Sequence, residues 1–163
     1  MSEALLNVFS ASRLSDSMKG MASFSQNGAY NEEAFRYLLE SESKRSERSG
    51  HCYQILLVYR TTVQGGIDQM DSPLARTVIH ALSICLRETD YIGWYREGRV
   101  MGGVLTVVGR DAVSDVSSLV QSRLLEILRV ELGAEQSSRL HIRVCQQHEL
   151  GSVELDEESL AAN

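Results

Sequence analysis

The chain has 163 residues, of which 43% are hydrophobic and 23% are charged, and that length supports one sizeable core rather than several domains. One proline and twelve glycines are too few for a disordered or collagen-like chain. No run approaches the roughly 18 to 20 consecutive apolar residues that a membrane-spanning helix needs. We therefore expect one soluble globular domain without membrane insertion.

The net charge of −6 is concentrated at the C-terminal end. Residues 149–163 contain five acidic residues and no lysine or arginine, which leaves residues 1–148 with a net charge of −1. A nearly neutral body lacks the basic face with which proteins bind nucleic acid non-specifically. The charge therefore predicts no nucleic-acid partner, and it marks residues 149–163 as an acidic C-terminal tail.

The three cysteines, Cys52, Cys85 and Cys145, are far apart, and each lies in an apolar run. An odd number in such surroundings favours buried thiols in a reducing compartment over disulfides or metal ligands. The first residues also lack the basic segment and long apolar run of an export signal. We therefore expect a cytoplasmic protein.

Residues 1–30 are rich in serine and predict a flexible or short-helical leader, followed by a domain over residues 31–148. Asn31 is suited to cap the first helix of that domain, and Gly50 is suited to end it. The compact apolar run over residues 51–59 is typical of a central strand buried on both faces.

A loop over residues 61–71 precedes the second predicted helix. Ser72 is the expected N-cap, Pro73 is the expected first helical residue, and apolar spacing continues the helix to about Thr89. The glycine pair at 102–103 predicts a bulge or a close backbone approach in a later strand. The remaining elements are a β-hairpin of strands 91–95 and 100–108, a helix from about 114 to 133, and a strand over 140–145.

This order is one helix followed by βαββαβ. Two right-handed crossovers close such a chain into an antiparallel four-stranded sheet with helices on one face. The predicted fold class is therefore α/β, an α+β sandwich, with a ferredoxin-like βαββαβ palm, a mainly antiparallel sheet and an extra N-terminal helix. That fold serves several unrelated functions, so the fold alone predicts none of them.

The stretch 86–100 reads Leu-Arg-Glu-Thr-Asp-Tyr-Ile-Gly-Trp-Tyr-Arg-Glu-Gly-Arg-Val. Its Arg-x-x-Asp motif, formed by Arg87 and Asp90, is followed after five residues by the hairpin turn. This spacing, and the order of elements over residues 31–148, resembles GGDEF domains, the diguanylate cyclases of bacterial cyclic di-GMP signalling.

The resemblance implies two metal ions held by an Asp at the end of the first strand and by an acidic residue of the signature turn. At the strand end this sequence has Tyr59, Arg60 and Thr61 instead. The turn Gly-Gly-Asp/Glu-Glu-Phe is replaced by Arg96, Glu97, Gly98, Arg99 and Val100. Positive charge at such a position disfavours a bound cation. We therefore expect a degenerate domain, a pseudoenzyme with no catalytic residue, no metal and no cofactor.

In the family the Arg-x-x-Asp motif forms an inhibitory site for cyclic di-GMP, because a guanidinium can bind guanine O6 and N7 while a carboxylate accepts from N1 and N2. One hypothesis is therefore a cyclic di-GMP receptor that uses Arg87 and Asp90. The alternative is structural: Arg87 lies in the last turn of a helix and Asp90 caps the following turn.

The main hypothesis is a catalytically inactive GGDEF-like domain that acts in signalling or as a scaffold through protein–protein interaction. The partner is another protein or a second copy in a homodimer. Trp94 and Tyr95 are candidate interface anchors, and the alternative is that one packs inward while the other lies on the sheet. The histidines lie on separate elements without metal-ligand spacing.

Overall fold

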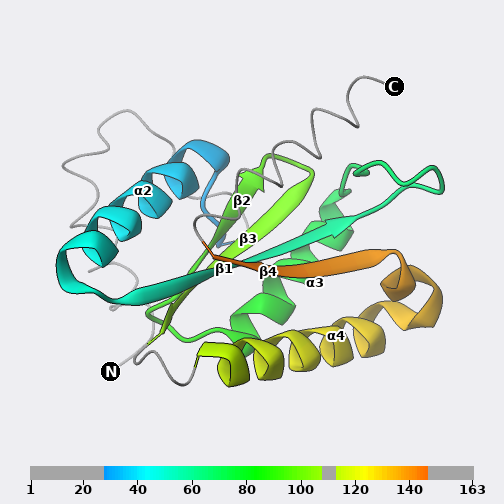
Figure 1. Cartoon of the computed structure of the whole chain (residues 1–163). Helices are drawn as coiled ribbons and strands as arrows, with labels where there is room; N and C mark the ends of the chain where they lie inside the picture. Colours follow the sequence, from blue (N-terminus) through cyan, green and yellow to red (C-terminus); the bar gives the residue numbers. More distant parts are fainter. Residues whose placement is uncertain (1–27, 108–112, 147–163) are drawn as a thin grey trace.

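The computed structural model of the chain describes residues 28–107 and 113–146. Most of the predicted leader and all of the acidic tail lie outside these ranges, so their boundaries stay a prediction. Figure 1 shows a sheet between helices. The elements are α2 (Glu32–Ser49), β1 (Cys52–Arg60), α3 (Ser72–Cys85), β2 (Tyr91–Arg96), β3 (Val100–Val107), α4 (Val113–Ser138) and β4 (Leu140–Cys145).

The sheet has four strands in the order β2-β3-β1-β4. Each neighbouring pair is antiparallel. This is the strand order of a ferredoxin-like βαββαβ unit, and it confirms the predicted fold class. β1 lies between β3 and β4, so the apolar run predicted to form a central strand does so.

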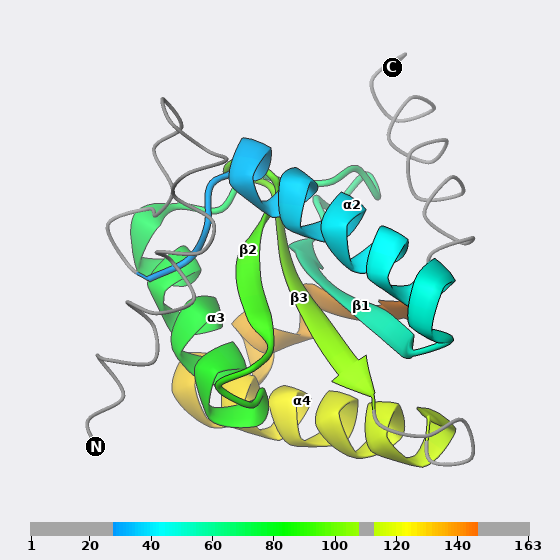
Figure 2. The same ribbon diagram turned by 90° about the vertical axis from the view of Figure 1, so that its left-hand side faces the viewer.

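The two faces of the sheet carry separate cores. α3 and α4 cover one face and α2 lies on the other (Figures 1 and 2). Side chains alternate along β1: Leu56 and Val58 belong to the core under α3 and α4, whereas Ile55 and Leu57 belong to the core under α2. The extra N-terminal helix therefore gives the second face a core of its own.

α2 begins and ends as its sequence predicts. The Asn31 Oδ1 atom accepts a hydrogen bond from the Ala34 N–H at 2.8 Å, which satisfies one of the helix's unpaired N-terminal donors. Gly50 ends the helix in the left-handed conformation, with φ +70°, where a side chain would be strained.

α3 differs from the prediction at both ends. Asp71, not Ser72, is the N-cap, because its Oδ1 atom accepts from the Leu74 N–H at 2.9 Å. The helix ends at Cys85 rather than near Thr89, and Leu86 is extended. The side chain of Asp90 accepts the Arg87 N–H, so the chain turns before another helical turn forms.

The glycine pair is closely approached, but by side chains and not by the backbone as predicted. An added Cβ at Gly102 would lie 2.7 Å from two ring atoms of Phe35, and one at Gly103 would lie 2.7 Å from Leu86 Cδ1. The strand irregularity lies elsewhere, in β2 between Trp94 and Arg96.

The long helix ends at Gly133, as predicted. Gly133 has the non-helical dihedrals φ +82° and ψ 168°, which put a kink in α4, and a second short helical segment follows it to Ser138. Across the ranges that the structure describes, no helix combines the length and hydropathy that crossing a bilayer requires.

The cysteines are unpaired, as predicted. Only Cys145 is buried, because Cys52 and Cys85 are half-buried at the strand and helix ends. Burial raises the pKa of the Cys85 thiol, and nearby Arg123 partly opposes this. The thiol form is therefore favoured at neutral pH, as expected for a packing residue.

Candidate functional site

The signature turn is a tight turn between β2 and β3. The Arg99 N–H donates to the Arg96 carbonyl at 3.0 Å, and Gly98 takes the left-handed conformation with φ +75°. Val100 pairs with Tyr59 across the sheet. The turn and the carboxyl end of β1 therefore lie side by side, as the resemblance predicts.

Glu97 is hydrogen-bonded to the first turn of α2. Its Oε2 atom accepts from the Glu32 N–H at 3.1 Å, and Glu32 Oε2 accepts from the Glu97 N–H at 2.8 Å. The helix N-terminus carries partial positive charge, which favours both carboxylates there. The one carboxylate of the turn thus already accepts a backbone hydrogen bond.

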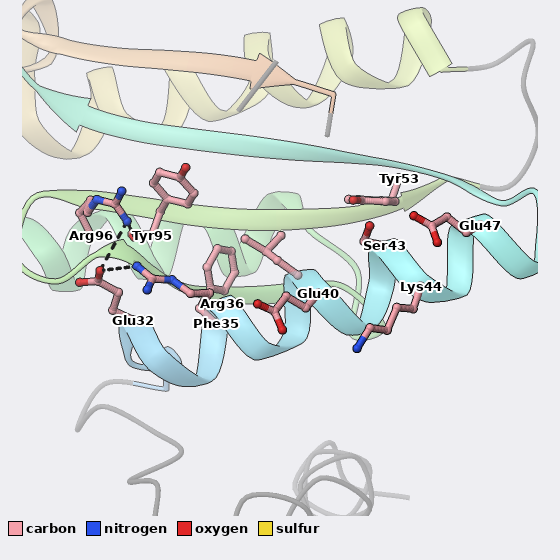
Figure 3. A pocket seen from close by; sticks show the side chains of 11 residues that line it. Glu32, Phe35, Arg36, Glu40, Ser43, Lys44, Glu47, Tyr53, Tyr95 and Arg96 are labelled. Atoms are coloured by element: carbon pink, nitrogen blue, oxygen red, sulfur yellow. Dashed lines mark hydrogen bonds and ion pairs between the residues drawn. The ribbon is translucent and has the colours of Figure 1, made fainter. Parts of the chain in front are cut away.

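Two arginines balance the Glu32 carboxylate (Figure 3). Arg36 Nη2 lies 3.1 Å and Arg96 Nη1 lies 3.5 Å from Glu32 Oε1. The Arg96 guanidinium also lies over the Tyr95 ring, 5.0 Å from its centroid, within the range of a cation–π interaction. The turn is thereby held against α2 by ion pairs and backbone bonds together.

The end of β1 carries no carboxylate. Arg60 Nε lies 3.1 Å from Asp68 Oδ2, in the loop that follows the strand. The Tyr59 ring stacks on His141 with centroids 5.5 Å apart, and Thr61 Oγ1 lies 2.9 Å from His141 Nε2. Each of the three positions is therefore occupied by a contact within the sheet or its loop.

These residues do not fit the pair of metal ions that the resemblance implies. Hard divalent cations take several oxygen ligands, above all carboxylates. At this position the strand end presents a guanidinium, and Glu97 accepts a backbone hydrogen bond. Among residues 28–107 and 113–146, no group of three His, Cys, Asp or Glu side chains could hold a metal ion.

The structure brings Arg87 and Asp90 together at the other end of β2. The Asp90 side chain is only 1% exposed and the Arg87 side chain is 56% exposed, with Arg87 Nε 3.7 Å from Asp90 Oδ2. Oδ2 also accepts from the Arg87 N–H at 2.8 Å. Arg87 lies beyond the end of α3, so its predicted place in the last helical turn is wrong.

Thr106 completes this arrangement. Its N–H and its hydroxyl both donate to Asp90 Oδ1 at 3.1 Å. Its carbonyl accepts from Arg87 Nη2. Both carboxylate oxygens of Asp90 are therefore used within the protein, where they join the turn before β2 to the end of β3. This agrees with the structural interpretation of Asp90 as a cap.

A groove of about 490 Å³ lies between α2 and the sheet, next to the signature turn (Figure 3). The sheet contributes aromatic rings, and the helix contributes charged side chains of both signs. The lining residues are Glu32, Phe35, Arg36, Leu39, Glu40, Ser43, Lys44, Glu47, Tyr53, Tyr95 and Arg96. Its volume is in the range of small ligand sites.

No pattern in the sequence predicted this groove. Its one sequence signal is the four-residue spacing of Glu32, Arg36, Glu40 and Lys44, which places these side chains on one helix face. That pattern is also typical of a solvated helix. The distance between helix and sheet, which creates the groove, depends on tertiary packing.

Tyr53 forms one end of the groove. Burial raises the pKa of its hydroxyl, a hydrogen bond with Ser43 opposes this, and the nearby carboxylates of Glu42 and Glu47 raise it further. The hydroxyl therefore stays protonated at neutral pH. The groove thus offers a neutral phenol and charged side chains over an apolar floor.

Trp94 and Tyr95 are both packed inside the protein, each 7% exposed. Trp94 belongs to the core under α3 and α4, whereas Tyr95 belongs to the core under α2. The packed interpretation is the one that the structure supports, and neither ring projects as an interface anchor. Tyr95 contributes to the groove only as part of its lining.

No family model matches the chain, and no curated protein matches it by sequence. Solved structures match it well. A DGC protein from Thermotoga maritima has a TM-score of 0.59 and 17% identity, over 82% of this chain and 96% of that one. The GGDEF domain of DgcB from Caulobacter crescentus, in complex with c-di-GMP, has a TM-score of 0.53 and 12% identity, over 86% and 89%.

Diguanylate cyclase SiaD from Pseudomonas aeruginosa, in complex with its activator SiaC, has a TM-score of 0.56 and 16% identity, over 97% of this chain and 68% of that one. At these identities the likeness defines a fold rather than an activity. The chain has the GGDEF-domain fold, which confirms the fold that the resemblance predicted.

Proposed function

We propose that this chain is a catalytically inactive GGDEF-type domain that acts in signalling, as a regulator or scaffold, by binding another protein. The observation that carries the proposal is the chemistry at the carboxyl end of β1 and the adjoining turn. Arg60 is paired with Asp68, and Glu97 is bound to the N-terminus of α2. A relative in fold, SiaD, was solved in complex with its activator SiaC, which supports a role in protein binding.

The absence of catalysis follows from electrostatics. Nucleotidyl transfer requires metal ions that neutralise the triphosphate and position the reacting oxygens. Arg60 ends β1, and Arg96 and Arg99 flank the adjoining turn, so cationic side chains stand where the family has carboxylates, and like charges repel a metal ion. The guanidinium groups can neutralise phosphate, but they do not activate a 3′-hydroxyl.

Incubation of the purified chain with GTP and Mg²⁺ is expected to give no pppGpG and no cyclic di-GMP. Nucleotide chromatography measures this, with an active diguanylate cyclase in parallel to establish that the assay works. A matched sample with Mn²⁺ tests whether a softer cation enters the site. Either product above the enzyme-free background would contradict the proposal.

The groove beside α2 is the surface on which we place the protein contact. Its side chains of both signs, Arg36, Glu40 and Lys44, are exposed on the helix, and half-buried Leu39 lies between them. Such a lining suits a peptide segment that carries charges of both signs and one apolar side chain, since hot spots combine apolar anchors with a polar rim.

Placing negative charge on this surface is expected to abolish partner binding without unfolding the chain. The double variant Leu39→Glu, Lys44→Glu changes the groove, and Leu125→Glu, Arg129→Glu makes the same chemical change on the exposed face of α4. A tagged chain captures its partner from an extract of the source cells, with recovery by the groove variant reduced at least about tenfold.

Equal recovery by both double variants, or no protein retained by the wild-type chain, would refute this assignment. Circular dichroism establishes that each variant is folded. Light scattering over a range of concentrations identifies the case in which the partner is a second copy, because a homodimer then dissociates in the groove variant alone.

The alternative is a cyclic di-GMP receptor that uses Arg87 and Asp90. The exposed guanidinium of Arg87 supports it, as does the relative in fold DgcB, solved in complex with c-di-GMP. The burial of Asp90 counts against it, since a ligand would have to displace Thr106. Titration calorimetry with cyclic di-GMP tests this alternative. If the wild-type chain gives no heat of binding, the receptor function is refuted.

A further inference from the structure

Exposed apolar side chains gather on one layer of the molecule, the helices α3 and α4. Among the residues that the structure describes, five large apolar side chains are exposed, and four of them lie on these two helices: Ile84, Leu119, Leu125 and Val130. The two most exposed of the four, Leu119 at 70% and Val130 at 79%, both lie on α4. Apolar side chains scattered singly over a surface need no explanation, whereas a group on one helix is typical of a contact surface.

Leu119 and Val130 lie on the same side of α4, with two charged side chains between them. Residues 119, 123, 126 and 130 are spaced by four, three and four positions, which places them within about 60° of one another around the helix. The two in the middle are Arg123 and Glu126, and both are exposed. The four residues extend over about 16 Å of the helix, and we call them the α4 stripe.

The two charges of the stripe are not paired within the described part of the chain. Arg123 and Glu126 are three positions apart, a spacing at which helical ion pairs form. Neither of them takes part in an ion pair among the described residues. Arg123 acts instead on the thiol of Cys85, whose pKa it lowers against the effect of burial. Both charges are therefore available to a group from another molecule.

The stripe is complementary to its own reverse. From the N-terminal end it is apolar, basic, acidic and apolar, and from the C-terminal end it is apolar, acidic, basic and apolar. A second α4 that runs antiparallel therefore sets Leu119 against the partner's Val130 and Arg123 against the partner's Glu126. Two-fold symmetry makes each of these pairs form twice. A parallel arrangement would instead set like charges against each other.

α4 is placed where a second copy can reach it. In Figures 1 and 2, α4 forms the outer layer on one side of the sheet, and α2 lies on the other side. Leu124 and Leu128, which attach α4 to the core, are fully buried. Because the stripe takes no part in that packing, a contact through it leaves the core unchanged.

We propose that the α4 stripe is a homodimer contact, in which α4 packs antiparallel against α4 of a second copy across a two-fold axis. The opposite charges fix the direction of the second helix, and the apolar ends are removed from water. A contact of this size is small for a stable dimer, so the expected Kd is on the order of 10–100 µM.

This contact lies beyond the proposed function, because the groove beside α2 is on the opposite face of the sheet. The two grooves of the dimer stay accessible. If the groove binds a protein, as proposed above, one dimer therefore holds two partner molecules, which increases avidity for a partner that is itself multivalent.

Sedimentation velocity of the full chain between about 5 and 500 µM tests the dimer. The wild-type chain is expected to change from monomer to dimer over this range. Arg123→Glu and Glu126→Arg are each expected to weaken association at least about tenfold, because each sets like charges against each other at two symmetric places. Arg48→Glu, which reverses an exposed arginine in the last turn of α2, is expected to associate like the wild type.

Mixing the two single variants gives a result that a damaged helix would not give. The Arg123→Glu chain has two acidic residues in its stripe, and the Glu126→Arg chain has two basic residues. The mixture is therefore expected to form a heterodimer with about the wild-type affinity. The double variant Arg123→Glu, Glu126→Arg restores the opposite pairing within one sequence and is expected to form a homodimer again. Circular dichroism establishes that each variant is folded.

Three outcomes would overturn the α4 dimer: a wild-type chain that stays monomeric at the highest concentration, equal loss of association in Arg48→Glu and Arg123→Glu, or single variants that do not associate when mixed. A dimer that dissociates in the groove variant would also overturn it. A monomeric wild-type chain that still captures its partner refutes the stripe and leaves the proposed function intact. A dimer that captures no other protein supports the stripe and refutes the groove.

Discussion

Replacing Asp90 with alanine is expected to lower the free energy of unfolding by about 2–4 kcal/mol, because it removes a buried carboxylate that accepts three hydrogen bonds, two of them part-buried. The Thr106 N–H, the Thr106 hydroxyl and the Arg87 N–H all donate to this one carboxylate. Arg87→Ala is expected to cost less than about 1 kcal/mol, since its side chain is more than half exposed. Urea unfolding followed by circular dichroism measures both.

Glu88→Ala is the matched control for these two variants, because it removes an exposed carboxylate from the same turn. It is expected to leave the free energy of unfolding within about 0.5 kcal/mol of the wild type. An Asp90→Ala chain as stable as this control, with heat of cyclic di-GMP binding lost, would instead establish the receptor function. Comparing Asp90→Ala with Glu88→Ala therefore distinguishes a structural role of the Arg-x-x-Asp motif from a role in ligand binding.

The elements themselves were largely predictable, because their signals are local. Asn31 caps α2 and Gly50 ends it. The apolar run over residues 51–59 became the central strand. Each prediction depends on residues within a few positions of one another. The antiparallel order then follows from short connections and right-handed crossovers.

The errors arose where a distant side chain decides the local structure. The apolar spacing through Leu86 favours a longer helix, but Asp90 is anchored by Thr106 on β3. Its other oxygen accepts the Arg87 N–H, so the turn replaces a further helical turn. Asp71 and Ser72 are both good caps by type, and only the geometry of the incoming loop selects Asp71.

The residue types at the candidate site could be predicted from the sequence, but the contacts between those residues could not. The sequence shows that Arg60 and Glu97 replace the residues expected from the GGDEF resemblance. It does not show that Arg60 pairs with Asp68 or that Glu97 binds Glu32. Glu32 and Glu97 are 65 positions apart, and their bonds depend on where α2 lies on the sheet.

Gly93→Ala and Gly102→Ala are each expected to lower the free energy of unfolding by about 1–3 kcal/mol, because the added methyl group overlaps the ring of Phe35. The two glycines are paired across β2 and β3, and the ring of Phe35 lies on them. An added Cβ would lie 2.5 Å from Phe35 Cδ2 at Gly93 and 2.7 Å from Phe35 Cε1 at Gly102. Phe35 is fully buried, so relieving either overlap requires its ring to shift within the packing between α2 and the sheet.

Replacing Phe35 with a smaller side chain tests directly whether its ring causes the destabilisation. In a Phe35→Leu background, the further cost of Gly102→Ala is expected to fall below about 1 kcal/mol, since contacting residues are energetically coupled. Gly66→Ala is the control, because its Cβ would lie 3.5 Å from Thr62 Oγ1, an ordinary contact. If Gly102→Ala costs the same in both backgrounds, its effect comes from the backbone of β3, and α2 is not seated on the sheet through Phe35.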